Sequence, residues 1–159
     1  MKGLVSRANL AAAAEKLRRG GERIVFTNGC FDLLHPGHIS LISRAASLGD
    51  RLVVAINDDA SVRKLKGDTR PIYRAEERAE ILLAIRWVDC VTVFPEDTPI
   101  ETIRLIRPDV LVKGGEYRQR EIVGATFVRS YGGSVVRIPM KKGHATRRIV
   151  ARLTSDERR

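Results

Sequence analysis

The sequence predicts one α/β domain in which helices cover both faces of a parallel β-sheet. Short runs of apolar residues alternate along the chain with segments of helical periodicity. The apolar runs are nearly continuous, as expected of strands that are buried on both faces. The 159 residues are 43% hydrophobic and 30% charged, which is a globular composition, and a chain of this length can bury a core without disulfides or a structural metal.

The predicted elements alternate from the first helix to the last. A helix over residues 7–19 is rich in Ala and Leu and ends at Gly20-Gly21, and a helix over 37–48 carries an apolar stripe and ends at Gly49. Strands are expected at 24–26, 52–56, 88–94, 110–112 and 134–138, and further helices at 75–86, 99–106, 121–130 and from about 145 onward. Because there is no internal repeat, low-complexity tract or linker, we expect an N-terminal helix within residues 1–21 and a single domain over residues 22–159.

The basic charge of the chain is concentrated at its two ends. Twenty-nine Lys and Arg minus nineteen Asp and Glu give a net charge of +10. Residues 1–20 carry five basic side chains against one acidic, residues 141–159 carry seven against two, and the stretch between them carries seventeen against sixteen. A nucleic-acid interface is more often a basic face interleaved with aromatic residues, and aromatics make up only 5% of this chain. We therefore expect solvated basic ends and no nucleic-acid partner.

The cysteines and the apolar runs bear on where the protein acts. Cys30 and Cys90 lie far apart and outside any Cys/His cluster, which is untypical of a zinc site or of a secreted disulfide framework. No apolar run approaches the length of a membrane span, and polar residues interrupt the apolar segment near the N-terminus. We expect a cytoplasmic protein with no membrane partner.

Residues 27–38, which follow the first strand, carry the clearest chemical signal, because parallel sheets bind ligands at the carboxyl ends of their strands. His35 and His38 flank Pro36-Gly37, and Pro in a first helical turn places both imidazoles at a helix N-terminus. Free N–H groups and the helix dipole favour an anion there, and the glycine lets it approach the backbone. Alternatively, the two histidines form a metal pair or cap the helix. A metal would need a third ligand, and the only other histidine is His144.

These residues resemble the H-x-G-H signature of a superfamily of nucleotidyltransferases that includes the cytidylyltransferases, pantetheine-phosphate adenylyltransferase and, more distantly, class I aminoacyl-tRNA synthetases. Over roughly residues 22–150 the chain is most similar to the D-glycero-β-D-manno-heptose 1-phosphate adenylyltransferases, a family often fused to a sugar kinase. The motifs that carry this resemblance are Thr27-Asn28-Gly29-Cys30-Phe31-Asp32, Gly49-Asp50, Lys64-x-Lys66-Gly67, Arg70-Pro71, Glu77-Arg78, Val88-Asp89, the run from Pro108 to Gly115, and Ile122-Val123-Gly124-Ala125.

The resemblance implies a Rossmann-like, doubly wound sheet of five strands in the order 3-2-1-4-5, in a protein that forms a homodimer. It also implies transfer of AMP from ATP to the sugar 1-phosphate by direct in-line attack, giving ADP-heptose and pyrophosphate. Such an attack needs no protein nucleophile, only alignment of two anions and cationic or N–H groups around the developing charge. Mg²⁺ would arrive with the nucleotide, because no tight carboxylate cage is evident and no resident metal is expected.

The same resemblance implies roles for individual residues. The expected catalytic residues are His35, His38 and Lys66. The expected nucleotide-binding residues are Thr27, Asn28, Gly29, Cys30, Phe31, Gly37, Lys113, Gly114, Gly115, Thr146 and Arg147. The expected substrate-binding residues are Asp32, Asn57, Asp58 and Arg70.

Several of these residues have a plainer interpretation. The Lys64-x-Lys66 motif falls in a polar segment, where both side chains could be solvated loop residues. Asp32 could orient a histidine, contact the acceptor or cap a turn, and Asn57-Asp58 could bind sugar hydroxyls or form a turn. Gly114-Gly115 could lie against the base or supply a positive φ. Glu77-Arg78 are also typical of charges on a helix surface.

The chain departs from its family after Gly143. Where the superfamily commonly has a Ser-Thr-Thr or Ser-Thr-Ser run, this chain has Ala145-Thr146-Arg147, so only Thr146 keeps a hydroxyl. The helix N-terminus still offers N–H groups, and Arg147 could either pair with phosphate oxygens or point to solvent. Two other functions remain open: a cytidylyltransferase for another small phosphate or phosphonate acceptor, and a non-catalytic module that binds a nucleotide or nucleic acid.

Overall fold

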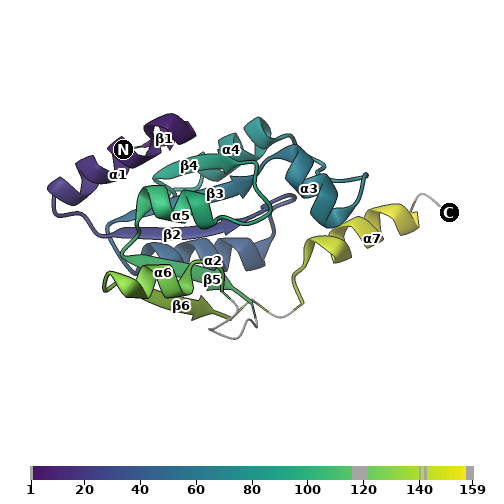
Figure 1. Cartoon of the computed structure of the whole chain (residues 1–159). Coiled ribbons are helices and arrows are strands. Elements are labelled where there is room, and N and C mark those ends of the chain that lie inside the picture. Colours follow the sequence, from purple (N-terminus) through teal and green to yellow (C-terminus); the bar gives the residue numbers. More distant parts are fainter. Residues whose placement is uncertain (1, 116–121, 140, 142, 157–159) are drawn as a thin grey trace.

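A parallel β-sheet lies at the centre of the computed structural model, which describes residues 2–115, 122–139, 141 and 143–156 (Figure 1). Within these ranges the sheet has six strands in the order β1-β4-β3-β2-β5-β6, and each neighbouring pair is parallel. The strands are β1 (Gly3–Leu4), β2 (Ile24–Gly29), β3 (Arg51–Asn57), β4 (Cys90–Phe94), β5 (Val110–Gly114) and β6 (Ser134–Ile138). The predicted α/β class with a parallel sheet is confirmed.

The number of strands differs from the prediction. The five predicted strands correspond to β2 through β6 and follow the expected order, and β1 adds a sixth strand at the edge beside β4. Gly3 of β1 pairs with Cys90, and Leu4 pairs with Val91. A strand of two residues is too short to show a hydrophobic period, so only its pairing with β4 reveals it.

Helices cover both faces of the sheet. They are α1 (Arg7–Arg19), α2 (Pro36–Ala46), α3 (Asp59–Lys66), α4 (Ala75–Leu83), α5 (Ile100–Ile106), α6 (Ala125–Ser130) and α7 (Thr146–Asp156). One core joins Leu10 of α1 to Phe26 of β2, and the core on the other face joins Ile42 of α2 to Val25 of β2. Successive residues of β2 therefore face opposite layers, as the unbroken apolar pattern predicts.

One predicted loop and several predicted helix ends need correction: the helix expected over 37–48 ends at Ala46, and the helix expected over 75–86 ends at Leu83. The polar segment that carries Lys64 and Lys66 is the helix α3 and not a loop. Asp58 caps this helix by accepting a hydrogen bond from the Ser61 N–H at 2.7 Å, and Gly67, with a φ of 96°, follows its last residue. These caps define a helix that the charged composition concealed. The helix expected over 121–130 begins at 125 in the structure, and residue 121 lies outside the described residues.

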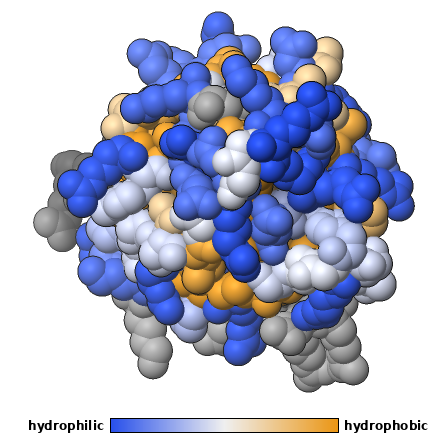
Figure 2. Space-filling view, turned by 90° about the vertical axis from the view of Figure 1, so that its left-hand side faces the viewer, coloured by the Kyte–Doolittle hydropathy of each residue, from blue (hydrophilic) through white to orange (hydrophobic). Residues whose placement is uncertain are grey.

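The carboxyl ends of the strands lie at one edge of the sheet, and α7 extends from this edge (Figure 1). Figure 2 shows the molecule from the opposite end, where hydrophilic side chains cover most of the surface and hydrophobic areas lie between them. Among the described residues, no helix is long and apolar enough to cross a membrane. Because all the strands are parallel, the loops that follow them lie together at the carboxyl edge, where sheets of this class bind their ligands.

Candidate active site

Three cavities open at the carboxyl edge of the sheet. Cavity 1 has a volume of about 380 Å³, cavity 2 of about 540 Å³ and cavity 3 of about 320 Å³. Cys30 and Lys66 line all three, so the cavities are parts of one cleft that meet at these two residues. Other lining residues include Asn28, Asn57, Leu65, Asp97, Thr98, Lys113 and Val123 in cavity 1, Asp32, His35, His38, Arg70, His144, Thr146 and Arg147 in cavity 2, and Asn28, Phe31, His38, Lys113 and Gly114 in cavity 3.

His35 is fixed by the helix that it begins. It is the N-cap of α2, and its Nδ1 accepts hydrogen bonds from the N–H groups of Gly37 at 3.1 Å and His38 at 3.4 Å. Since Nδ1 accepts, the proton of the neutral ring lies on Nε2. Burial lowers the pKa of His35, and the neighbouring His144 lowers it further. The ring is therefore a neutral donor with a set orientation.

His38 stacks on His35. The ring centroids are 3.8 Å apart and the ring planes differ by 18°. Burial lowers the pKa of His38 to about 4, with a smaller contribution from His35. Its Nδ1 is buried and has no hydrogen-bond partner among the described residues. At neutral pH both rings of the motif are therefore uncharged, and they can offer N–H groups to an anion but not a positive charge.

Cys30 and Lys113 also lie at the cleft. Burial raises the pKa of the Cys30 thiol, so this side chain stays protonated and is a poor nucleophile. Burial lowers the pKa of Lys113, whose Nζ donates to Asn28 Oδ1 at 3.2 Å. A protonated thiol fits a direct transfer, in which no covalent enzyme intermediate forms.

The loop between β2 and α2 has an unusual backbone. Phe31 and Leu33 have φ values of 47° and 55°, in the left-handed region that non-glycine residues rarely adopt. Such a conformation persists only when the surrounding structure holds it. Two side chains do so here: Arg78 binds the backbone of Cys30, and the Asp32 carboxylate binds the chain that precedes α4.

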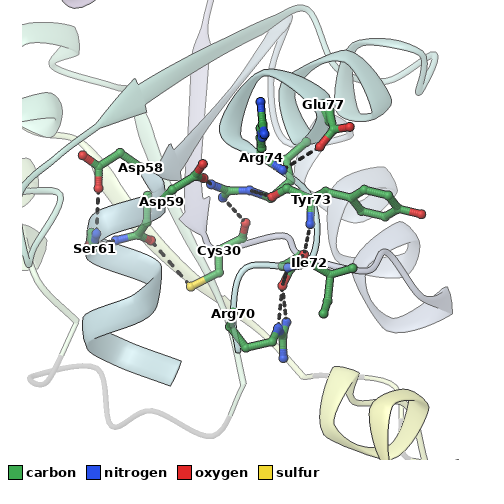
Figure 3. A network of polar contacts seen from close by, with 12 residues as sticks. Cys30, Asp58, Asp59, Ser61, Arg70, Ile72, Tyr73, Arg74 and Glu77 are labelled. Atoms are coloured by element: carbon green, nitrogen blue, oxygen red, sulfur yellow. Dashed lines mark hydrogen bonds and ion pairs between the residues drawn. The ribbon is translucent and has the colours of Figure 1, made fainter. Parts of the chain in front are cut away.

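Arg78 supports the β2–α2 loop from within the protein, although the sequence pattern is also typical of a charge on a helix surface. Its side chain is fully buried and does not lie on a helix surface. It donates to the carbonyl oxygens of Cys30 at 2.7 Å and Tyr73 at 3.0 Å, and to Asp59 Oδ1 at 2.7 Å. Figure 3 shows this network, which joins the β2–α2 loop to α3 and to the chain before α4. The Glu77-Arg78 motif was the only sequence signal for this role.

Asp32 is also fully buried. Its carboxylate accepts hydrogen bonds from Arg70 Nε at 2.6 Å and from the N–H groups of Ile72 and Tyr73, and it forms an ion pair with Arg70 Nη2 at 2.5 Å. Its main-chain oxygen accepts from Thr146 Oγ1 at 3.1 Å. Asp32 therefore connects three segments that form cavity 2.

The two lysines of α3 point to different surroundings. Lys64 Nζ forms an exposed ion pair with Asp97 Oδ2 at 2.5 Å and lines none of the three cavities. Lys66 lies at the end of α3 and lines all of them. The structure thus brings the expected lysine, and not its neighbour, into the cleft.

Some predicted site residues have structural contacts instead. Asn57 lines cavity 1, but its Nδ2 also donates to Ser61 Oγ at 2.9 Å, and Asp58 caps α3 outside the cavities. The Gly37 N–H donates to Nδ1 of the capping residue His35, and Gly115 has the positive φ of a turn, 112°. Thr27 is fully buried, and its Oγ1 has no hydrogen-bond partner within the described part of the chain. The cavities do not include Thr27, Gly37, Asp58 or Gly115 among their lining residues.

The start of α7 completes cavity 2. The ring of His144 lies 6.5 Å from that of His35 between centroids, although 109 positions separate them in sequence. Arg147 lines the cavity, whereas Arg148 Nη1 donates to the Gly143 carbonyl oxygen at 3.1 Å. His144 was not among the expected site residues, since its isolated position in the sequence gives no sign of this proximity.

Among the described residues, no group of three or more His, Cys, Asp or Glu is arranged to hold a metal ion. The only carboxylate that lines cavity 2 in this part of the chain is Asp32, whose oxygens are occupied by Arg70 and two backbone N–H groups.

The sheet is doubly wound, and two neutral imidazoles lie at the start of α2, which follows the central strand β2. Lys66, Arg70 and Arg147 line the same cavity. These features are typical of a nucleotide-binding α/β domain. The chain belongs to the cytidylyltransferase-like family, whose model matches residues 26–136. The resemblance to nucleotidyltransferases that the sequence motifs carry is thereby confirmed.

Similar proteins agree with this family. The chain is 51% identical over 152 residues to "Bifunctional protein HldE" of Gluconobacter oxydans, covering 96% of this chain and 32% of that protein. It is 54% identical over 147 residues to the protein of the same name from Koribacter versatilis, covering 92% and 30%. The chain thus spans about a third of the length of these curated relatives.

Solved structures share the fold. The lipopolysaccharide core biosynthesis protein from Thermoplasma volcanium superposes with a TM-score of 0.64 and 26% identity, covering 78% of this chain and 100% of that one. Pantoate-beta-alanine ligase from Francisella tularensis superposes with a TM-score of 0.61 and 16% identity, covering 89% and 68%. The second likeness is one of fold alone.

Proposed function

We propose that this chain transfers AMP from ATP to D-glycero-β-D-manno-heptose 1-phosphate, giving ADP-heptose and pyrophosphate. Membership of the cytidylyltransferase-like family and about 50% identity to HldE proteins support this assignment. The observation that carries it is the position of Lys66 at the junction of all three cavities. A cation at that junction can meet the phosphates of two substrates at once.

The three cavities divide the substrates between them. Cavity 2, with its two imidazoles, Arg70 and the start of α7, suits the triphosphate. Cavity 3 lies between His38 and Gly114 and suits the ribose and base, which the glycine allows to approach the backbone. Cavity 1 remains for the sugar, and Asp97, Thr98 and Asn57 offer partners for its hydroxyl groups.

The proposed reaction is a single displacement. An oxygen of the sugar phosphate attacks the α-phosphorus of ATP, the bond from that phosphorus to the bridging oxygen of the β-phosphate breaks, and pyrophosphate leaves with the electron pair. His35 and His38 donate N–H groups to phosphate oxygens, and Lys66 offsets the charge of the two approaching phosphates. Mg²⁺ enters with the nucleotide and neutralises phosphate charge when bound.

A cytoplasmic location and a homodimer remain predictions from the resemblance to this family. Two alternatives can be distinguished from the proposal by pyrophosphate release. One is a transferase that uses CTP and another phosphate acceptor, and the other is a non-catalytic module. Each of them predicts a different pattern of pyrophosphate release.

The decisive experiment measures pyrophosphate release with ATP or CTP against heptose 1-phosphate, glycerol phosphate and a phosphonate, with His38→Ala as the inactive control. We expect release only with ATP and the heptose. Preference for CTP with another acceptor would establish the alternative transferase. Nucleotide binding without release for any pair would contradict an enzymatic role.

A further inference from the structure

We propose that Asp32 is a positioning residue that holds Arg70 in the orientation required to bind the pyrophosphate end of the nucleotide. This inference rests on the proposed function, because it assigns a role within the same cleft. It changes the expectation from sequence, in which Asp32 and Arg70 were both residues that bind the acceptor substrate.

The hydrogen bonds of Asp32 leave no place for a substrate. Its carboxylate is fully buried, with Oδ1 accepting from the N–H groups of Ile72 and Tyr73, both at 3.1 Å. Oδ2 accepts from Arg70 Nε and from the Ile72 N–H at 2.9 Å. A sugar hydroxyl could bind Asp32 only by displacing one of these donors, and a phosphate would be repelled by its charge.

The Arg70 guanidinium has N–H donors that do not bind Asp32. Asp32 engages the edge of the guanidinium formed by Nε and Nη2, at 2.6 and 2.5 Å. The planar group carries five N–H donors, so the edge formed by Nη1 and the outer N–H of Nη2 remains available for a second anion. With its side chain 14% exposed, Arg70 is held firmly but can be reached from cavity 2. A guanidinium fixed in this way can bind a phosphate through two parallel hydrogen bonds.

The position of Arg70 indicates which phosphate it binds. Arg70 lines cavity 2 but neither cavity 1 nor cavity 3, whereas Lys66 lines all three. The transferred α-phosphate must lie near Lys66, because it contacts both substrates. Arg70 shares cavity 2, which we assign to the triphosphate, with Thr146 and Arg147. Its ligand is therefore the leaving pyrophosphate and not the phosphate of the acceptor.

Asp32 also holds the start of α7, which forms another part of the lining of cavity 2. Its main-chain oxygen accepts from Thr146 Oγ1, so the start of α7 and the segment with Arg70 are attached to the same residue. The carboxylate supplies a partner for the guanidinium when no nucleotide is bound. Without that partner, burying the charged Arg70 guanidinium would cost free energy, and the side chain would turn toward water.

The test is the affinity for inorganic pyrophosphate, measured by calorimetry on the full chain. Arg70→Gln and Asp32→Asn should each weaken binding by tenfold or more, and the double variant should be no weaker than Arg70→Gln alone, because Asp32 acts through Arg70. Lys64→Gln, which also removes one positive charge but lies outside cavity 2, should leave the affinity within twofold of the unchanged chain.

The kinetic arm separates positioning from a general loss of structure. Asp32→Asn should raise the inhibition constant for pyrophosphate while the KM for heptose 1-phosphate changes less than twofold. Equal losses for both ligands, or additive effects of the two substitutions, would overturn the proposal.

If Asp32→Asn does not fold, the variant Arg70→Lys tests which ligand Arg70 binds. Lysine keeps the positive charge but lacks the paired N–H donors of arginine. Normal pyrophosphate affinity of Arg70→Lys would contradict our inference. Pyrophosphate binding needs no turnover, so these results remain informative even if heptose 1-phosphate proves not to be the substrate.

Discussion

Cavities 1 and 2 lie side by side in the cleft but are built differently. In cavity 2 hydrogen bonds hold the side chains in place: His35 caps its own helix, Arg70 binds the Asp32 carboxylate, and Thr146 binds the Asp32 main-chain oxygen. In cavity 1 the rim is exposed, since Leu65 is 50% and Val123 42% accessible and Asp97 belongs to a surface ion pair. Cavity 2, where we propose that the triphosphate binds, is thus preorganised, whereas cavity 1, the proposed acceptor end, has an exposed rim that can adapt to a ligand.

This difference explains why the chemistry is easier to infer than the acceptor. Phosphate groups are the same in every nucleotide, so a rigid set of donors suits any nucleoside triphosphate. An acceptor differs between enzymes, and exposed side chains can change without disturbing the core. The following experiments test whether the two cavities differ as described, from the largest expected effect to the smallest.

The largest effect should come from cavity 2. We expect His38→Ala to lower kcat by about 10²–10³, roughly 2.7–4 kcal/mol, because it removes a fixed donor to the charge that develops at phosphorus. Steady-state kinetics with both substrates would measure the loss, with circular dichroism as the control for folding. Near-normal turnover in a folded variant would show that cavity 2 is not the catalytic part of the cleft.

Acid should destabilise the preorganised cavity. The pKa of His38 is about 4 in the folded chain against 6.5 for an ordinary histidine. The unfolded chain therefore takes up a proton that the folded chain does not, and stability falls as pH drops from 6.5 toward 4, by up to about 3 kcal/mol. Urea unfolding at pH 7 and pH 4.5 would measure this fall. In His38→Gln the free energy of unfolding should fall less between the two pH values. An identical fall in this variant would show that a group other than His38 causes it.

The junction between the cavities can be tested by comparing two lysines on one helix. We expect Lys66→Ala to weaken productive binding of both substrates, by about 1.5–3 kcal/mol if it makes charged hydrogen bonds. Lys64→Ala should have little effect, because its ion pair with Asp97 is exposed. The readout is kcat/KM for each substrate. A damaging Lys64→Ala beside a silent Lys66→Ala would reverse our assignment of the two side chains.

Cavity 1 should influence only the acceptor. We expect Asp97→Asn to raise the KM for heptose 1-phosphate about fivefold, the loss of roughly 1 kcal/mol for one hydrogen bond, and to leave the KM for ATP unchanged. Initial rates with each substrate varied in turn would show this. A rise confined to ATP would mean that the two cavities have been exchanged.

The smallest effect concerns the start of α7. Arg147→Ala should raise the KM for the nucleotide severalfold, whereas Arg148→Ala should not, because consecutive helical residues point about 100° apart and Arg148 already binds the Gly143 carbonyl oxygen. Both variants remove one charge, so each controls for the other. Equal effects that disappear in high salt would indicate that neither arginine touches the nucleotide.

Much of the fold was visible in the sequence because its signals are local. The helix over residues 7–19 agrees with α1 at both ends, and the unbroken apolar runs identified β2 through β6. The pair His35 and His38 was also local, since Pro36 and the three-residue spacing place both rings at one helix start. Helix periods and caps depend on neighbours within about four positions, which a sequence displays directly.

The tertiary structure decided the features that depend on distant partners. The strand β1 exists only through its pairing with β4, and the burial of Arg78 depends on Cys30, 48 positions earlier. The Thr146 hydroxyl meets the Asp32 main chain across 114 positions. No local pattern encodes such contacts, because they depend on where the strands place their loops. For that reason the sequence by itself determined the type of fold and the two histidines of the motif, whereas folding decided which further side chains surround them.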